Sequence, residues 1–311
     1  MREDVMRKTG VVWFCALICC LLWGSAFPCV KIGYQLFEIG ASDSVSQIMF
    51  AGIRFFIAGV LTLVFGSILQ RKMLIPKKQD IPSILKLSVF QTILQYFFFY
   101  IGLAHTTGVK SSIIVAANVF IAILIASLIF HQEELTKQKM IGCLIGFAGV
   151  VLINTGSGGI NMQFQWNGEL FILLSTVAYA LASVFIKRYS VKIDPVLLSG
   201  WQFCAGGLVM AVAGKALGGN LVFSGGKSAV LLLYLAIISS VAFTLWGILL
   251  KYNPVSRVTV FGFMNPVFGV ILSAVLLKEN GQAFSLRGLT SLVLVCVGIY
   301  LVNRCGSSSK A

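Results

Sequence analysis

Neutral polar side chains recur inside long apolar runs of this chain, where they could bind a small molecule. Gln91 and Gln95 are four residues apart, and Ser175, Tyr179 and Ser183 repeat that interval. Residues four apart share one face of a helix, so these groups can converge on a cavity. The full set expected to bind a solute is Trp23, Gln91, Gln95, Tyr96, Tyr100, Asn118, Ser175, Tyr179, Ser183, Trp246 and Asn265. Such a neutral, aromatic lining suits a zwitterionic or uncharged solute with an apolar part. Each of these groups could also simply form hydrogen bonds between helices.

Two charged side chains are candidate charge partners for a solute. Arg54 is the basic residue well inside an apolar run, about eight residues or roughly 12 Å from its end. It could bind a carboxylate through paired hydrogen bonds, or it could play a structural role by reaching outward or binding helix carbonyls. Glu169, near the start of another run, is the candidate acidic partner. No carboxylate is expected at mid-membrane, which favours facilitated movement, exchange, or coupling through a less common group.

The elements that must position these residues are membrane helices. Hydrophobic residues make up 58% of the 311 residues and charged residues only 11%, whereas a soluble domain has about 25% charged residues. Apolar runs of about 20 residues are typical of helices that cross a bilayer. The sequence predicts ten of them, at 10–34, 46–69, 83–104, 110–131, 138–155, 166–187, 195–216, 228–250, 255–278 and 285–303. The fold class predicted is therefore all-α and integral to the membrane.

The charge pattern indicates how these helices are oriented. The formal net charge is +14, and the basic residues lie mainly in short links on one side of the predicted membrane. Positive loops stay in the cytoplasm, so we expect a multi-pass protein of the cytoplasmic membrane with both termini cytoplasmic. No soluble module carries a basic stripe, which argues against nucleic acid as a partner. Membrane lipid and a small-molecule substrate are the expected partners, and the oligomeric state is left open.

Residues suited to catalysis or to metal binding do not cluster in the sequence. Seven of the eight cysteines lie inside apolar runs, and His105 and His131 lie at the ends of runs. We find no nucleophile elbow and no phosphate-binding loop. The sequence therefore predicts no enzyme activity, no catalytic residue, no cofactor and no metal site.

The chain also resembles itself. The stretch LICCLLWGSAFPCVK (17–31) aligns with LLSTVAYALASVFIK (173–187), and GVVLIN (149–154) aligns with GIYLVN (298–303). Glu133 and Glu279 each follow a long apolar run at equivalent places. We predict two repeats, residues 1–155 and 156–311, with five helices each. An odd number of helices inverts the second copy, and inverted repeats are typical of secondary transporters.

Three residues are predicted hinges. Pro28 cannot donate to the carbonyl of Gly24, so the first helix should bend there. Gly24 allows close packing at that bend, and Trp23 would face the solute. Pro266 follows Asn265 in the ninth run, whereas the equivalent Asn118 precedes valine, so the two halves should not bend alike.

Several motifs together resemble a known family. They are WGSAF (23–27), IRFFIAG (53–59), GLAHTTGVKSS (102–112), GCLIGFAG (142–149) and NPVFGVILSAVLLKE (265–279). In these motifs the chain resembles the drug/metabolite transporter superfamily, in its ten-helix EamA type. The resemblance implies alternating access and termini inside, but no particular solute, since relatives export amino acids, drugs and other metabolites.

The function predicted is secondary transport of small metabolites, with export of amino acids or related zwitterionic or neutral solutes as the leading interpretation. Uptake or exchange of another metabolite class is the alternative. A membrane scaffold without transport activity would leave the inverted repeat unexplained. An enzyme that modifies lipid would need Asp, His or Arg clustered at a membrane edge.

Overall fold

The computed structural model describes residues 2–129, 135–154, 165–190, 192–253 and 260–304. Every regular element within these ranges is helical, and no strand occurs among them. This agrees with the predicted all-α class. The boundary expected between residues 155 and 156, the loop residue Glu133 and the start of the predicted run at 255 lie outside the described residues.

The first half of the chain forms eleven of these elements. They are α1 (Arg2–Arg7), α2 (Thr9–Leu36), α3 (Ser44–Gln70), η1 (Lys78–Asp80), α4 (Ile81–Leu87), η2 (Ser88–Leu94), α5 (Gln95–His105), α6 (Gly108–Val115), α7 (Asn118–Leu124), η3 (Ile125–Ile129) and α8 (Lys137–Asn154). η1 is a 3₁₀ turn, whereas η2 and η3 are π-helical.

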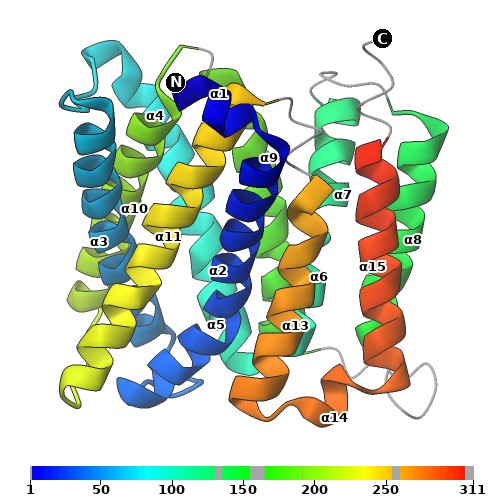
Figure 1. Ribbon diagram of the computed structural model, residues 1–311. Helices are drawn as coiled ribbons and strands as arrows, with labels where there is room; N and C mark the ends of the chain where they lie inside the picture. Colours follow the sequence, from blue (N-terminus) through cyan, green and yellow to red (C-terminus); the bar gives the residue numbers. More distant parts are fainter. Residues whose placement is uncertain (1, 130–134, 155–164, 191, 254–259, 305–311) are drawn as a thin grey trace.

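The second half forms η4 (Trp166–Leu170), α9 (Phe171–Tyr189), α10 (Pro195–Ala216), α11 (Gly226–Tyr252), η5 (Val260–Phe263), α13 (Met264–Leu277), α14 (Asn280–Ala283) and α15 (Leu286–Arg304). η4 is π-helical and η5 is a 3₁₀ turn. The helices run side by side, and α1 lies at the same end of the bundle as the last turn of α15 (Figure 1).

Seven helical runs among the described residues are long and apolar enough to cross a membrane. They are Thr9–Leu36, Ser44–Gln70, Lys78–His105, Gly108–Ile129, Trp166–Ile186, Pro195–Ala216 and Gly226–Trp246. The chain is therefore a multi-pass membrane protein. The shorter apolar helices α13 and α15, together with α8, lie where the remaining three spans are predicted, so a total of ten spans stays a prediction.

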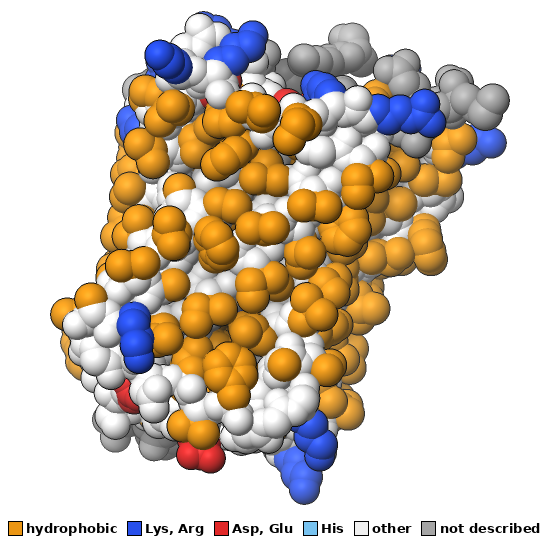
Figure 2. Space-filling view, turned by 90° about the vertical axis from the view of Figure 1, so that its left-hand side faces the viewer, with side chains coloured by type: hydrophobic (Ala, Val, Ile, Leu, Met, Phe, Trp, Pro, Cys, Tyr) orange, Lys and Arg blue, Asp and Glu red, His pale blue; other side chains and the backbone are white. Residues whose placement is uncertain are grey.

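The outer surface of the bundle is apolar, as a lipid environment requires. On α3, Phe56, Val60 and Val64 are exposed, whereas Phe55 and Ala58 on the other face are buried. Hydrophobic side chains cover the middle of the face in Figure 2, and Lys and Arg lie mainly toward its upper and lower ends. Exposed apolar residues here face hydrocarbon rather than water, which explains why one helix can be apolar all round.

The two halves of the chain are joined by two tightly packed helix pairs. α3 lies against α10, where a methyl group added at Gly52 would collide with the backbone of Ala211. α8 lies against α15, where a methyl group at Gly142 would lie 2.9 Å from the carbonyl oxygen of Gly298. Small residues allow helix backbones to approach closely in membranes, where packing drives association. The glycines of GCLIGFAG therefore contact the other half.

One end of the bundle, where α14 lies, carries a group of polar contacts that we call the α14-end network (Figure 1). The carboxylate of Glu279 accepts hydrogen bonds from the backbone N–H groups of Gly108 and Val109, at 3.1 and 2.9 Å. Lys31 donates to the carbonyl oxygens of Leu103 and Thr106 at the end of α5. An anion at the N-terminus of α6 and a cation at the C-terminus of α5 both complement the helix dipoles. Thr107, Gln282, Lys110 and Glu169 complete the network.

Candidate substrate-binding site

Arg54 is the centre of the candidate site, and it is buried with 3% of its surface exposed. Its Nε donates to the carbonyl oxygen of Leu235 at 3.0 Å, and Nη1 donates to the hydroxyl of Tyr100 at 2.5 Å. Nη2 donates to Oγ of Ser239 at 3.0 Å. The side chain therefore joins α3 to α5 and α11 through neutral groups. It neither reaches outward nor meets a carboxylate among the described residues, so no acidic side chain there neutralises its charge.

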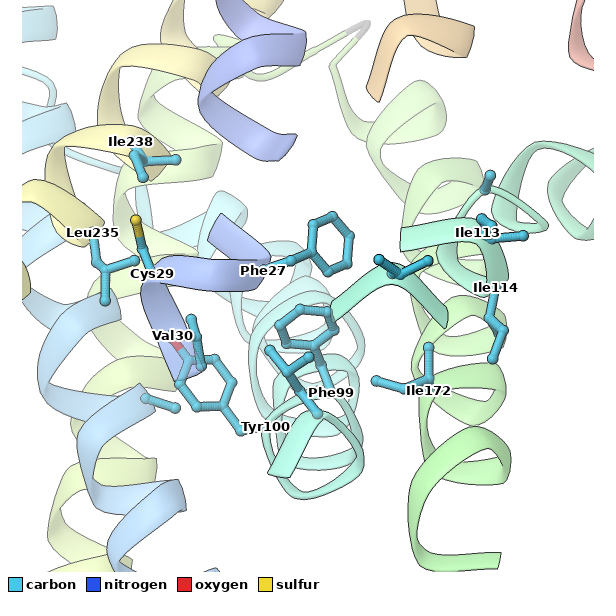
Figure 3. Packing of buried hydrophobic residues seen from close by; sticks show 14 of the residues in the cluster. Phe27, Cys29, Val30, Phe99, Tyr100, Ile113, Ile114, Ile172, Leu235 and Ile238 are labelled. Carbon is cyan, nitrogen blue, oxygen red and sulfur yellow. The ribbon is translucent and has the colours of Figure 1, made fainter. Parts of the chain in front are cut away.

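Tyr100 is held in place by its neighbours on α2 and α3. The hydroxyl of Tyr34 donates to the Tyr100 carbonyl oxygen at 2.7 Å, and the Phe50 ring lies edge-on to the Tyr100 ring. Figure 3 shows Tyr100 beside Val30, close to the part of α11 that carries Leu235. Tyr100 was predicted to line the site, but its side chain is fully buried. Its hydroxyl contacts Arg54.

A continuous series of aromatic rings connects the other predicted residues. Trp23 contacts Trp246 and Phe243 edge-on, with ring centroids 5.2 and 5.5 Å apart. Phe243 contacts Phe203, which stacks on Phe55. The series continues to Tyr96, whose ring lies 3.9 Å from that of Phe55. Trp23, Trp246 and Tyr96 remain partly exposed, whereas Phe55 and Phe203 between them are fully buried. The structure thus brings together three residues that are far apart in the sequence.

The predicted amides Gln91 and Gln95 lie on a helix with a local π-turn. η2 contains Gln91, and Gln95 begins α5, so the four-residue interval spans the change in helical pitch. Gln91 is fully buried, and neither its Oε1 nor its Nε2 has a hydrogen-bond partner among the described residues; the same holds for Oε1 of Gln95. π-turns occur frequently at functional sites. Most buried polar groups are hydrogen-bonded, so unpartnered amides are an unusual feature of this part of the bundle.

Asn118 and Asn265 mark interruptions in their helices. Ala116 and Ala117 form a turn between α6 and α7, and Asn118 is the first residue of α7. Asn265 is the second residue of α13, directly after the 3₁₀ turn η5. Its Oδ1 is buried and has no partner among the residues that the structure describes. Both segments are therefore interrupted at the asparagine, although only one contains proline, and discontinuous helices are a feature of carrier binding sites.

The three predicted hinge residues have different surroundings. α2 continues through Pro28, which is buried. Gly24 lies where α2 crosses α13, because an added methyl group there would lie 2.9 Å from the backbone nitrogen of Gly269. Pro266 lies in the first turn of α13, where a missing N–H group costs no helical hydrogen bond, so it starts this helix rather than breaking it. Hinge motion at any of the three stays a prediction.

The predicted residues of η4 and α9 divide into two groups. Ser183 donates to the carbonyl oxygen of Tyr179 in its own helix at 2.9 Å, and Ser175 is buried. Tyr179 is partly exposed. Glu169 belongs to the α14-end network, where Lys110, Thr106 and the backbone N–H of Gln165 contact its carboxylate. Its charge partner is therefore Lys110 and not Arg54.

Three contributors were missed by sequence reasoning. Ser239 accepts from Arg54, and Tyr34 supports Tyr100. Gln202 is fully buried on α10, accepts a hydrogen bond from Thr92, and has an unpartnered Nε2. The polar pair Ser239 and Ser240 inside the apolar run of α11 was a visible signal, as was Gln202 within α10. Nothing in the sequence linked Ser239 or Gln202 to Arg54.

No group of three or more His, Cys, Asp or Glu side chains that could hold a metal occurs within the described part of the chain. The cysteines described there are free, and the thiols of Cys19 and Cys20 donate to backbone carbonyl oxygens of other helices. The site instead offers amides, hydroxyls, aromatic rings and one guanidinium. Such groups can bind and orient a solute.

The helical fold and its apolar surface define a multi-pass membrane protein, with small-molecule recognition groups in its interior. Comparison with known sequences identifies the family: the profile described as "EamA-like transporter family" matches residues 9–155 and again residues 166–304. The chain belongs to the EamA-like transporter family. This membership points to a transporter rather than an enzyme, in a lipid environment and with a small-molecule substrate.

Individual relatives agree with this family. An uncharacterized transporter of Archaeoglobus fulgidus is 29% identical over 298 residues, which cover 94% of this chain and 98% of that protein. The uncharacterized transporter YvbV of Bacillus subtilis is 26% identical and covers 94% of this chain, and 91% of YvbV is covered. The uncharacterized inner membrane transporter YedA of Escherichia coli is 26% identical, covering 90% of this chain and 89% of YedA.

A solved crystal structure shares the fold. It superposes with a TM-score of 0.66 at 18% sequence identity, and the alignment covers 98% of this chain and all of the other. At this identity the similarity describes the fold alone.

Proposed function

We propose that the protein is a secondary transporter that exports amino acids or related zwitterionic or neutral metabolites across the cytoplasmic membrane. In this proposal ten helices form two inverted five-helix repeats, residues 1–155 and 156–311, and both termini are cytoplasmic. Alternating access exposes the interior site first to one side of the membrane and then to the other.

One observation carries this proposal: buried amides without partners lie inside the bundle. In the part of the chain that the structure describes, Gln91 has no partner for either polar atom, and Gln95, Gln202 and Asn265 each have one unpartnered atom. An unpaired buried polar group costs about 1–3 kcal/mol, so a protein retains several of them only for a reason. A solute with polar ends would supply the missing partners during its passage. The neighbouring rings of Trp23, Tyr96 and Trp246 would contact its apolar part.

Three further observations support the inverted repeats. The family profile matches two separate stretches of the chain, which correspond closely to the proposed halves. The tight pairs α3 with α10 and α8 with α15 each join one half to the other, as a two-fold exchange of equivalent helices requires. Both Asn118 and Asn265 lie at helix interruptions, which is the symmetric position expected of a shared site.

Reconstitution tests the transport function directly. Purified protein in liposomes is presented with a panel of radiolabelled amino acids, amines, sugars and carboxylic acids, and uptake is compared with that of protein-free liposomes. We expect protein-dependent flux of one solute group with polar and apolar parts. Right-side-out and inverted membrane vesicles then give the direction, and net movement out of the cytoplasm supports export.

Variants connect the flux to the site. Gln95→Leu and Asn265→Leu should lower flux at least severalfold while the protein stays folded, because each change removes an amide that the solute would bind. Val64→Leu, on the lipid-exposed face of α3, is the matched control and should transport normally. Wild-type flux in both amide variants would remove these residues from the site. Flux of no solute across the panel would contradict the carrier function.

A further inference from the structure

The groups around Arg54 form a cluster with more hydrogen-bond donors than acceptors. Three N–H groups of Arg54 donate to Leu235, Tyr100 and Ser239, and its remaining N–H groups have no acceptor among the described residues. The hydroxyls of Tyr100 and Ser239 accept from Arg54, yet neither donates its own proton to any described group. Two N–H groups of Arg54 and the hydroxyl protons of Tyr100 and Ser239 are therefore left without an acceptor among the described residues.

Burial makes this imbalance costly. Tyr100 is fully buried, Ser239 is 1% exposed and Arg54 is 3% exposed, so bulk water does not solvate the positive charge. The Phe55 ring lies 4.7 Å from the guanidinium carbon, which gives partial compensation through a cation–π contact. The one described ion pair lies elsewhere, between Lys110 and Glu169. A buried charge without a partner is strongly unfavourable, and an anion bound at the unused donors would remove that penalty.

We propose that Arg54, Tyr100 and Ser239 form a binding site for a single carboxylate group, carried by the transported solute. The two carboxylate oxygens accept from the unused N–H groups of Arg54 and from the hydroxyls of Tyr100 and Ser239. The substrate class is thereby narrowed from zwitterionic or neutral solutes to solutes with one carboxylate, such as amino acids or monocarboxylates. This assignment rests on the proposed transport function in one respect: it treats the carboxylate as part of the transported solute.

The charge of the site favours a carboxylate over a phosphate. Among the described contacts of this cluster, Arg54 supplies the positive charge, and a single guanidinium balances one negative charge. A phosphate dianion would leave one negative charge buried without compensation. The fork of N–H groups on guanidinium also matches the paired oxygens of a carboxylate.

The aromatic series suggests how a solute reaches this site. Tyr96 is partly exposed and its ring lies 3.9 Å from the ring of Phe55, which in turn covers Arg54. One layer of aromatic side chains thus separates the partly exposed residues from the donor cluster. A shift of the Phe55 and Tyr96 rings would open a path for the carboxylate, and their return would enclose it.

The test is anion binding to the purified full-length protein in detergent, measured as the rise in melting temperature. Sodium acetate is titrated at constant ionic strength, with sodium isethionate as the balancing salt, and sodium chloride is titrated in a parallel series. We expect saturable stabilisation by acetate and little by chloride. Tyr100→Phe should raise the apparent dissociation constant for acetate about tenfold or more, because a hydrogen bond to a charged group is lost.

Matched variants separate binding from general stability. Thr62→Val removes a buried hydroxyl on α3 that donates to the carbonyl oxygen of Ala58 in its own helix, and it leaves every donor of the cluster, so its acetate affinity should equal that of the wild type. Ser239→Ala should weaken acetate binding as Tyr100→Phe does, and it serves as the second variant if Tyr100→Phe does not fold. Equal acetate responses in wild type, Tyr100→Phe and Ser239→Ala would overturn the assignment, as would stabilisation by chloride alone.

The two proposals fail in different ways. Acetate binding that depends on Tyr100, together with no flux of any solute in liposomes, would contradict transport and leave the anion site standing. Flux without any saturable acetate binding would contradict the anion site and leave transport standing.

Discussion

The α14-end network and the interior amides use the same kinds of polar group in opposite ways. In the network, the Glu279 and Glu169 carboxylates have named partners, and Lys31 binds the carbonyl oxygens that end α5. In the interior, Gln91 has no partner within the described ranges, and Gln95 and Asn265 each have an oxygen without one there. The carboxylates of the network have partners within the protein, whereas these interior amides have polar atoms without a partner among the described residues.

This difference separates groups that hold the fold from groups that are available for binding. A satisfied polar network in a low-dielectric interior rigidifies the elements that it joins, and an unsatisfied one destabilises the fold until something completes it. The network joins α2, α5, α6, η4 and α14 at one end of the bundle. Mutations there should therefore lower stability, and mutations of the interior amides should lower transport.

The largest expected effect is at Glu169. Glu169→Ala leaves Lys110 without its ion-pair partner and removes the contacts to Thr106 and Gln165, so the free energy of unfolding should fall by about 3 kcal/mol. Thermal denaturation in detergent measures this loss. Lys110→Met alone and combined with Glu169→Ala completes a double-mutant cycle. If the losses of unfolding free energy in the two single variants add up in the double variant, Lys110 and Glu169 do not stabilise each other. A Glu169→Ala variant that is as stable as the wild type but transports less per folded molecule would contradict a purely structural role.

Glu279→Ala should have the next largest effect. It removes the acceptor for the backbone N–H groups of Gly108 and Val109 at the start of α6, and loss of a helix cap costs about 1–2 kcal/mol. Glu279→Gln keeps one acceptor oxygen and should lose about half as much. The melting temperatures of the two variants are compared with that of the wild type. If all three are equal, Glu279 does not stabilise the start of α6.

Gln91→Leu should act in the opposite direction on stability. The change replaces two unpartnered polar atoms by an apolar group of similar size, so the free energy of unfolding should rise by about 1 kcal/mol. Transport in liposomes should fall at the same time, because a group that the solute would bind is lost. A destabilised Gln91→Leu variant would show that the amide has a structural partner, and the contrast between the two regions would then fail at this residue.

The smallest effect is expected at Ser183. Its hydroxyl donates to the carbonyl oxygen of Tyr179 within α9, where an alternative backbone bond already exists. Ser183→Ala should change the melting temperature and the transport rate within measurement error. A severalfold loss of flux in this variant would place Ser183 back among the solute-binding residues, as the four-residue spacing first indicated.

The sequence located the membrane helices better than the site. The predicted run at 195–216 coincides with α10, and that at 46–69 lies within α3, because unbroken hydrophobicity over about 20 residues is a strong local signal. Helical periodicity was less reliable for the site: it ignored the π-turn that contains Gln91 and the helix breaks at Asn118 and Asn265. It also grouped Ser183 with Tyr179 as solute-facing, although the serine hydroxyl bonds to its own helix.

What the sequence determined by itself was the class of molecule: an apolar chain with scattered polar groups, family motifs and a repeated pattern. These follow from local composition and order, because hydrocarbon selects helices wherever a run is long enough. Only the tertiary structure decided which polar groups have partners, because Arg54, Tyr100 and Ser239 come from three helices far apart along the chain. Which polar groups form hydrogen bonds depends on which helix faces pack together. Close backbone contacts, such as those at Gly24 and Gly52, determine which faces these are.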